Sequence, residues 1–196
     1  MKKVIRNTLL GVYQLSVNFS LYPLSALLLS ILTKPLSGKR EYRVLSLTKS
    51  VFSDDLRVIN GVSKRLQFLG FPRLLLSEIV KKHINNFQDL SDGSYYPLMD
   101  GTVERQAIYQ DMVKLLKWLL IFLKFDAVFA GNYVYVSQQE FFRACQDQGV
   151  KVVVLYKEGL APFGSMTERV NRRLYSNKRF YGDFMFFYNA TIRSKL

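Results

Sequence analysis

Two segments expected to follow strands carry side chains that could bind a polar substrate. The first contains Asn132, Tyr133 and Tyr135, which offer hydrogen-bonding groups and ring faces. The second, Lys157-Glu158-Gly159, places a cation and a carboxylate beside a flexible glycine, as a polar acceptor pocket would. In open α/β sheets, ligands bind outside the carboxyl ends of the strands, so these loops form the expected site. An exposed ion pair within the second loop is the plainer alternative.

Several common kinds of catalytic site are disfavoured by the residue types present. No glycine-rich dinucleotide or P-loop fingerprint follows a predicted strand, which disfavours nucleotide-cofactor enzymes and P-loop NTPases. The chain has one histidine, His83, and one cysteine, Cys145, so a Cys/His zinc site cannot be assembled. His83 follows two lysines and is typical of a surface residue, whereas Cys145 lies in an apolar stretch typical of a packed interior. We therefore predict neither a bound metal nor a cofactor.

The elements that would position the two loops follow from hydrophobic periodicity. A strand at 126–130, a helix at 137–148 and an almost continuously apolar strand at 150–155 form a parallel βαβ pattern. The same reasoning predicts strands at 42–47 and 72–76 and helices at 53–69, 77–84 and 103–124. The sequence thus predicts an α/β fold with a Rossmann-like, mostly parallel sheet and helices on both faces.

The N-terminal segment is apolar and basic, which indicates contact with a membrane. Residues 8–33 carry no charge and are long enough to cross roughly 30 Å of hydrocarbon as a helix. However, the first half is amphipathic and Pro23 interrupts the pattern, so an in-plane helix followed by a dipping segment is a serious alternative. A core helix of a soluble protein is a further alternative. We expect residues 1–40 to form a membrane-attachment segment and residues 41–196 a single α/β domain with a basic, aromatic C-terminal segment.

The charge balance supports a negatively charged partner. Lys and Arg outnumber Asp and Glu by 28 to 15, for a net charge of +13, which attracts anionic membrane surfaces. Nucleic acid is disfavoured by the apolar N-terminal segment, and the single cysteine favours the cytoplasmic side of the inner membrane. The basic residues expected to contact anionic lipid are Lys2, Lys3, Arg6, Lys39, Arg40, Arg172, Arg173 and Arg179.

Three segments resemble a known family. The segments 131–133, 137–141 and 153–159 resemble the N-terminal, acceptor-side domains of bacterial surface-carbohydrate and capsular polysaccharide glycosyltransferases of the GT-B type. The resemblance covers residues 42–162. The basic, apolar segment 1–40 also resembles the membrane-proximal leader of those proteins.

The resemblance implies a role in cell-surface polysaccharide synthesis. It implies an acceptor-side or scaffold role at Asn132, Tyr133, Lys157 and Glu158, where the acceptor would be a lipid-linked glycan. In that family a second Rossmann-like domain binds the sugar-nucleotide donor, and 196 residues leave no room for it. We therefore expect an acceptor-side half, from a truncated or split enzyme, that needs a partner chain with a donor-binding domain. The alternative is a non-enzymatic α/β scaffold that binds a membrane or a protein partner.

Overall fold

A computed structural model describes residues 2–36, 38–48, 52–87, 101–133, 135–156 and 180–187. Its helices are α1 (Lys2–Asn18), α2 (Tyr22–Leu32), α3 (Ser53–Val62), the 3-10 helix η2 (Arg73–Leu76), α4 (Ser77–His83), α6 (Val103–Leu123) and α7 (Gln139–Asp147). Its strands are β1 (Lys34–Pro35), β2 (Tyr42–Ser46), β3 (Leu66–Gly70), β4 (Ala127–Ala130), β5 (Lys151–Tyr156) and β6 (Phe184–Phe187).

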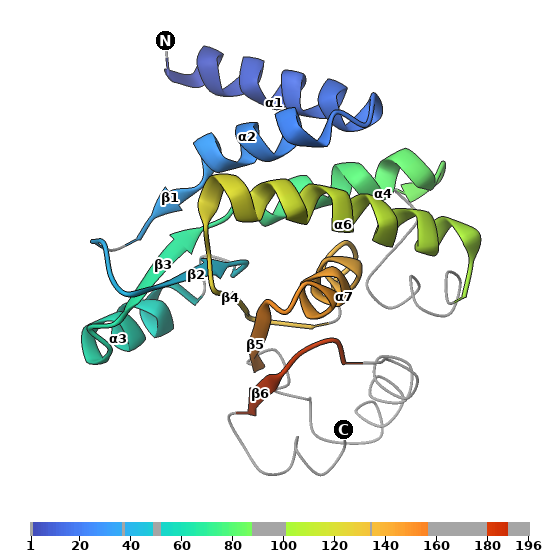
Figure 1. Ribbon diagram of the computed structural model, residues 1–196. Helices are drawn as coiled ribbons and strands as arrows, with labels where there is room; N and C mark the ends of the chain where they lie inside the picture. The colour runs from blue at the N-terminus through green and yellow to red at the C-terminus, as the bar shows by residue number, and fades with distance from the viewer. Residues whose placement is uncertain are drawn as a thin grey trace, which may run out of the picture.

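The described strands form a mostly parallel sheet, as the sequence predicted (Figure 1). The strand order is β1-β3-β2-β4-β5-β6, and β1 alone among them runs antiparallel, against β3. Because β2 has its successor β3 on one side and β4 on the other, the chain reverses its winding direction between β2 and β4. This is the topological switch point at which doubly wound sheets bind ligands.

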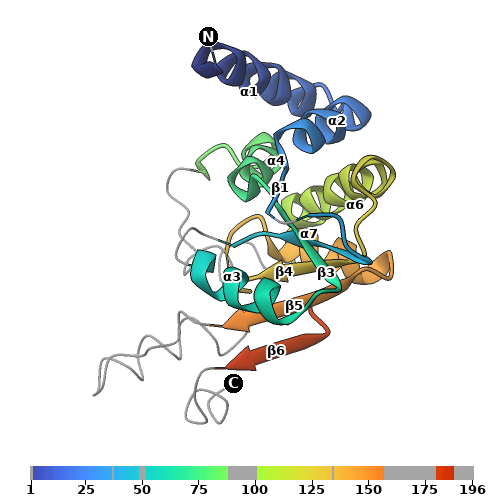
Figure 2. The ribbon, with the colours of Figure 1, turned by 90° about the vertical axis from the view of Figure 1, so that its left-hand side faces the viewer.

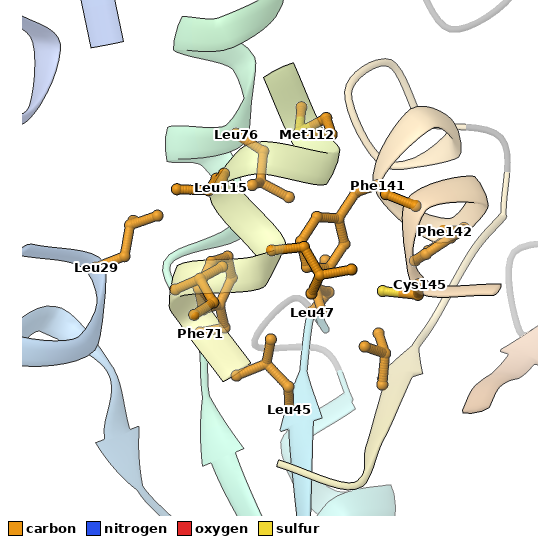
Figure 3. Packing of buried hydrophobic residues seen from close by; sticks show 14 of the residues in the cluster. Leu29, Leu45, Leu47, Phe71, Leu76, Met112, Leu115, Phe141, Phe142 and Cys145 are labelled. Atoms are coloured by element: carbon orange, nitrogen blue, oxygen red, sulfur yellow. The ribbon is translucent and has the colours of Figure 1, made fainter. Parts of the chain in front are cut away.

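Helices cover both faces of the sheet (Figure 2). On one face, α2, α4, α6 and α7 share a large core with strand residues such as Leu45, Val128 and Val152 (Figure 3). On the other face, Leu56 of α3 packs with Phe68 and other strand residues. Because successive strand residues point to opposite faces, strands covered on both sides are apolar almost throughout. That pattern made the 150–155 strand visible in the sequence.

Residues 63–76 differ from the sequence-based prediction. Helix α3 ends at Val62, and residues 66–70, predicted as its last turns, form β3 in register with β2. Residues 73–76, predicted as a strand, form η2, with Leu74 exposed and Leu76 buried. The spacing of Leu66 and Leu69 fits a helix or a strand, and pairing with β2 decides the outcome because tertiary contacts override weak local preference.

The first two helices form a hairpin that packs onto the domain. The chain reverses at Ser20, which has a positive φ of 58°, and a 2.8 Å hydrogen bond joins the hydroxyls of Ser16 and Ser25. Tyr13 of α1 and Leu29 of α2 are fully buried in the main core. Residues 34–35, predicted as part of the membrane-attachment segment, enter the sheet as β1. Residues 2–35 therefore share the core and the sheet of the α/β domain.

Candidate functional site

The switch point between β2 and β4 is closed by an aromatic ring. Leu47 donates its backbone N–H to Phe129 O at 2.8 Å, which holds the two strand ends together. Phe52 is buried, and an added Cβ at Gly131 would lie 2.3 Å from its ring. Glycine is therefore required at the carboxyl end of β4 because the ring of Phe52 occupies the space of a side chain. The usual ligand crevice is filled with protein at this point.

The structure places the first predicted loop at the expected edge, largely in the interior. Asn132 and Tyr133 follow β4 and are buried, and the Tyr133 ring lies 5.6 Å from that of Tyr156. Tyr135 is half-buried, and the guanidinium of Arg73 lies 5.0 Å from its ring centroid. Lys157, Glu158 and Gly159 lie outside the described residues. Substrate binding by these residues remains a prediction.

The start of α7 adds buried polar groups that the sequence analysis missed. Gln138, Gln139 and Glu140 are all buried, and Arg105 donates to Glu140 Oε1 at 2.5 Å. Gln139 donates its side-chain N–H to Tyr133 O, which fixes the loop after β4 against the helix. Within the described part of the chain, neither polar atom of the Gln138 amide has a hydrogen-bond partner. Buried polar groups without partners are rare, and they offer hydrogen bonds to a ligand.

Two adjoining cavities lie at the carboxyl ends of β2 and β3. The smaller, of about 400 Å³, has a mainly apolar lining that includes Leu56 and Phe68, and Ser46, Ser53 and Asn60 add polar groups. The larger, of about 940 Å³, runs between the N-terminal hairpin and the segment after β3. Thr48 and Phe71 line both cavities, so the two adjoin at these residues. We define the larger cavity as the hairpin groove.

The hairpin presents apolar side chains to the outside. Exposed residues of α1 and the turn after it include Leu15 and Phe19, and α6 adds Trp118, stacked on Phe122. The first acidic residue of the chain is Glu41, so none of residues 1–40 is negative. The exposed apolar residues of the hairpin are Ile5, Val12, Leu15, Phe19, Leu21, Leu24, Leu27 and Ile31, which together we call the outer hairpin surface. Isolated exposed apolar residues are ordinary, but such a gathering marks an interaction surface.

The predicted anion-binding residues fall in different places. Arg6 is exposed on α1 and borders the hairpin groove. Lys39 and Arg40 are exposed, and Arg40 donates to Lys64 O at 2.9 Å. This bond places Arg40 near the amino end of β3, whereas the groove lies at the carboxyl end of that strand. Lys2 and Lys3 belong to α1, but their side chains, like residues 172, 173 and 179, lie outside the described set. Among the described side chains of this set, Arg6 therefore lies apart from Lys39 and Arg40.

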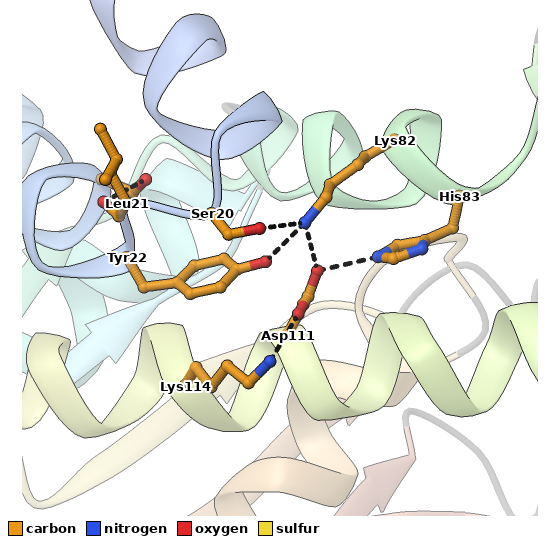
Figure 4. A network of polar contacts seen from close by, with 8 residues as sticks. Ser20, Leu21, Tyr22, Lys82, His83, Asp111 and Lys114 are labelled. Atoms are coloured by element: carbon orange, nitrogen blue, oxygen red, sulfur yellow. Dashed lines mark hydrogen bonds and ion pairs between the residues drawn. The ribbon is translucent and has the colours of Figure 1, made fainter.

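A polar network attaches the hairpin to the domain (Figure 4). Lys82 of α4 donates to Asp111 of α6 at 2.8 Å, to Ser20 at 2.7 Å and to Tyr22 at 3.0 Å. His83 Nε2 also lies 2.8 Å from Asp111 Oδ2. The carboxylate is almost fully buried, so each partner replaces water that it has lost. The ion pair between Lys82 and Asp111 therefore links α4 and α6 to α2 and to the turn at Ser20.

No described helix combines the length and the apolar character needed to span a bilayer. Among the described residues, no three His, Cys, Asp or Glu side chains are grouped so that they could hold a metal ion.

Comparisons with protein-family models, curated proteins and solved structures found no match to this chain.

Proposed function

We propose that this protein acts at an anionic membrane surface, with the hairpin lying in the plane of the interface. The observation that carries this proposal is the outer hairpin surface, which is apolar and belongs to a segment with six Lys and Arg and no acidic residue. In-plane amphipathic helices bind through buried apolar area together with attraction of cations to anionic lipid. The expected location is the cytoplasmic face of the inner membrane.

Within that role, we propose that the protein is the acceptor-side half of a GT-B-like glycosyltransferase of cell-surface polysaccharide synthesis. Support comes from the doubly wound sheet, from the smaller cavity at the carboxyl ends of β2 and β3 and from the resemblance of residues 42–162. A partner chain would supply the sugar-nucleotide donor. The protein would hold a lipid-linked acceptor near the membrane, and such positioning accelerates a reaction without a catalytic group of its own.

A non-enzymatic scaffold is the second candidate, and one observation favours it. The ring of Phe52 fills the space at Gly131, where a doubly wound enzyme would leave a crevice at the switch point. In this case the same hairpin binds the membrane and the domain binds a protein partner.

Sedimentation with lipid vesicles tests the membrane proposal. We expect the protein to bind vesicles of phosphatidylcholine mixed with phosphatidylglycerol, and to bind pure phosphatidylcholine at least about tenfold more weakly, because cations contribute about 1 kcal/mol each near an anionic surface. Raising the salt concentration should weaken binding to the anionic vesicles, since it shortens the range of electrostatic attraction. Failure to bind anionic vesicles at low salt would contradict the proposal.

Thermal unfolding with nucleotide-linked sugars separates the two candidates. A ligand that binds the folded state raises the unfolding temperature. For an acceptor-side half, we expect no shift with UDP-, GDP- or CDP-linked sugars alone, and a shift with a lipid-linked glycan. A scaffold should respond to neither class. A specific shift with a nucleotide sugar would show that the donor site lies in this chain and would overturn the acceptor-side assignment.

A further inference from the structure

The geometry points to the hairpin groove as a binding site for a lipid that carries a phosphate headgroup, drawn from the membrane. This assignment deepens the proposed function and rests on it for the source of the lipid. It adds a defined site, a ligand class and an orientation.

The walls of the groove suit a hydrocarbon chain. They include Leu9 and Leu10 of α1, Leu32 of α2, and Leu74 and Leu75 of η2. The volume of about 940 Å³ lies at the upper end of the range of about 300–1,000 Å³ found for ligand pockets. Leu74 is 70% exposed although it lines the groove. Covering it with a hydrocarbon chain would remove apolar surface from water.

The charges at the groove suit a phosphate. Arg6, Lys34 and Arg73 line it, and no acidic residue does. Among the described residues, no carboxylate forms an ion pair with Arg6 or Lys34, so both charges remain available to a ligand. Arg73 is held over the ring of Tyr135, which orients a guanidinium at this site. Guanidinium groups bind phosphate through paired hydrogen bonds.

The groove connects the outer hairpin surface to the edge of the sheet. Ile5 and Ile31 belong to both that surface and the groove, so a chain could enter from the bilayer. Thr48 and Phe71 also line the smaller cavity, where Asn60 Oδ1 is buried without a partner among the described residues. The lipid would therefore lie with its phosphate at Arg6, Lys34 and Arg73 and its hydrocarbon chain against the leucines of the groove.

Binding of decyl phosphate, measured below its micelle concentration and without vesicles, tests this site independently of membrane binding. We expect saturable binding that raises the unfolding temperature. Decyl glucoside, which has the same chain and an uncharged head, should bind at least tenfold more weakly, and inorganic phosphate should cause no shift. The variant Arg6→Gln/Lys34→Gln should lose at least tenfold in affinity for decyl phosphate. The control Lys117→Gln/Lys124→Gln, at exposed positions in α6 and directly after it and outside the groove, should match the unmodified protein.

Three results would overturn the assignment. Absence of saturable binding would remove the groove as a lipid site. Equal affinity for decyl phosphate and decyl glucoside would show that the groove makes no specific contact with the phosphate. An equal loss of decyl phosphate affinity in the two double variants would show that only the overall positive charge attracts the ligand. The decyl phosphate experiment contains no bilayer. If the protein binds decyl phosphate but fails to bind vesicles, the groove assignment stands and the membrane proposal is contradicted.

Discussion

Replacement of Asp111 by alanine should lower the free energy of unfolding by about 3 kcal/mol. The Asp111 side chain is 7% exposed, and its main partner, Lys82, is 19% exposed, so the variant leaves a largely buried ammonium group without its counter-ion. Removing one member of a buried ion pair costs about 3–5 kcal/mol, because the remaining charge loses its compensation. The change is measured as a shift in the urea unfolding midpoint.

A matched control is the exposed pair between Asp54 and Arg57, joined at 3.0 Å with side chains 80% and 79% exposed. Asp54→Ala should change stability by less than about 1 kcal/mol, because water screens such pairs. Similar losses from the Asp54 and Asp111 variants would show that the network in Figure 4 does not fasten the hairpin.

The lowered pKa of Asp111 also leads us to expect a loss of stability in acid. Burial alone would raise its pKa, but hydrogen bonds from Lys82, Tyr22 and His83 outweigh burial and lower the pKa to about 2. An unfolded aspartate has a pKa of about 3.9, so the network contributes stability that is fully present above about pH 4. That contribution, about 2–3 kcal/mol, is lost as the pH falls toward 2. Unfolding of Asp111→Asn should lack this part of the pH dependence, and equal slopes in both proteins would refute the role of Asp111.

Replacement of Gly131 by alanine should destabilise the protein by about 1–3 kcal/mol. The new Cβ would lie 2.3 Å from the ring of Phe52, which is fully buried and cannot move freely. Adding a methyl group to such a site forces side chains from their preferred positions. In a Phe52→Leu background, the cost of Gly131→Ala should fall by at least half. Equal cost in both backgrounds would show that the two residues are not coupled.

Gly61 provides a control for the Gly131 experiment. It lies in α3, and nothing is within 4 Å of the position of an added Cβ. Gly61→Ala should leave stability unchanged or raise it by up to about 1 kcal/mol, because alanine favours the helix. Contrasting results at the two glycines would show that the contact with Phe52, rather than the loss of glycine itself, causes the effect.

The sequence predicted the fold best where local and tertiary preferences agree. The β4-α7-β5 unit was predicted because its strands are almost wholly apolar and Gly149, with a φ of 72°, ends the helix. β3 was misassigned because its spacing is ambiguous. β6 was missed, although its run of apolar residues was a usable signal, because its position depends on Asp183, which accepts from Val152 N at 2.8 Å.

The candidate site was predictable only in part. The sequence correctly indicated that Asn132 and Tyr133 follow a strand, but their burial depends on distant rings, including that of Tyr156. The hairpin groove joins residues from α1, α2 and the segment after β3, and no local pattern links them. The buried network left one signal in the sequence: Asp111 is the only acidic residue of α6 beyond its first turn.

Vesicle binding by two matched double variants tests the central claim most directly. Leu15→Asn/Phe19→Asn alters the outer hairpin surface, where these residues are 58% and 71% exposed. Val58→Asn/Val62→Asn alters α3, where the valines are 65% and 82% exposed. Burial of one large apolar side chain contributes about 1.5–3 kcal/mol, so the hairpin variant should bind anionic vesicles at least about tenfold more weakly while the α3 variant binds normally. Unchanged binding by the hairpin variant, or equal loss in both, would contradict a membrane-facing hairpin.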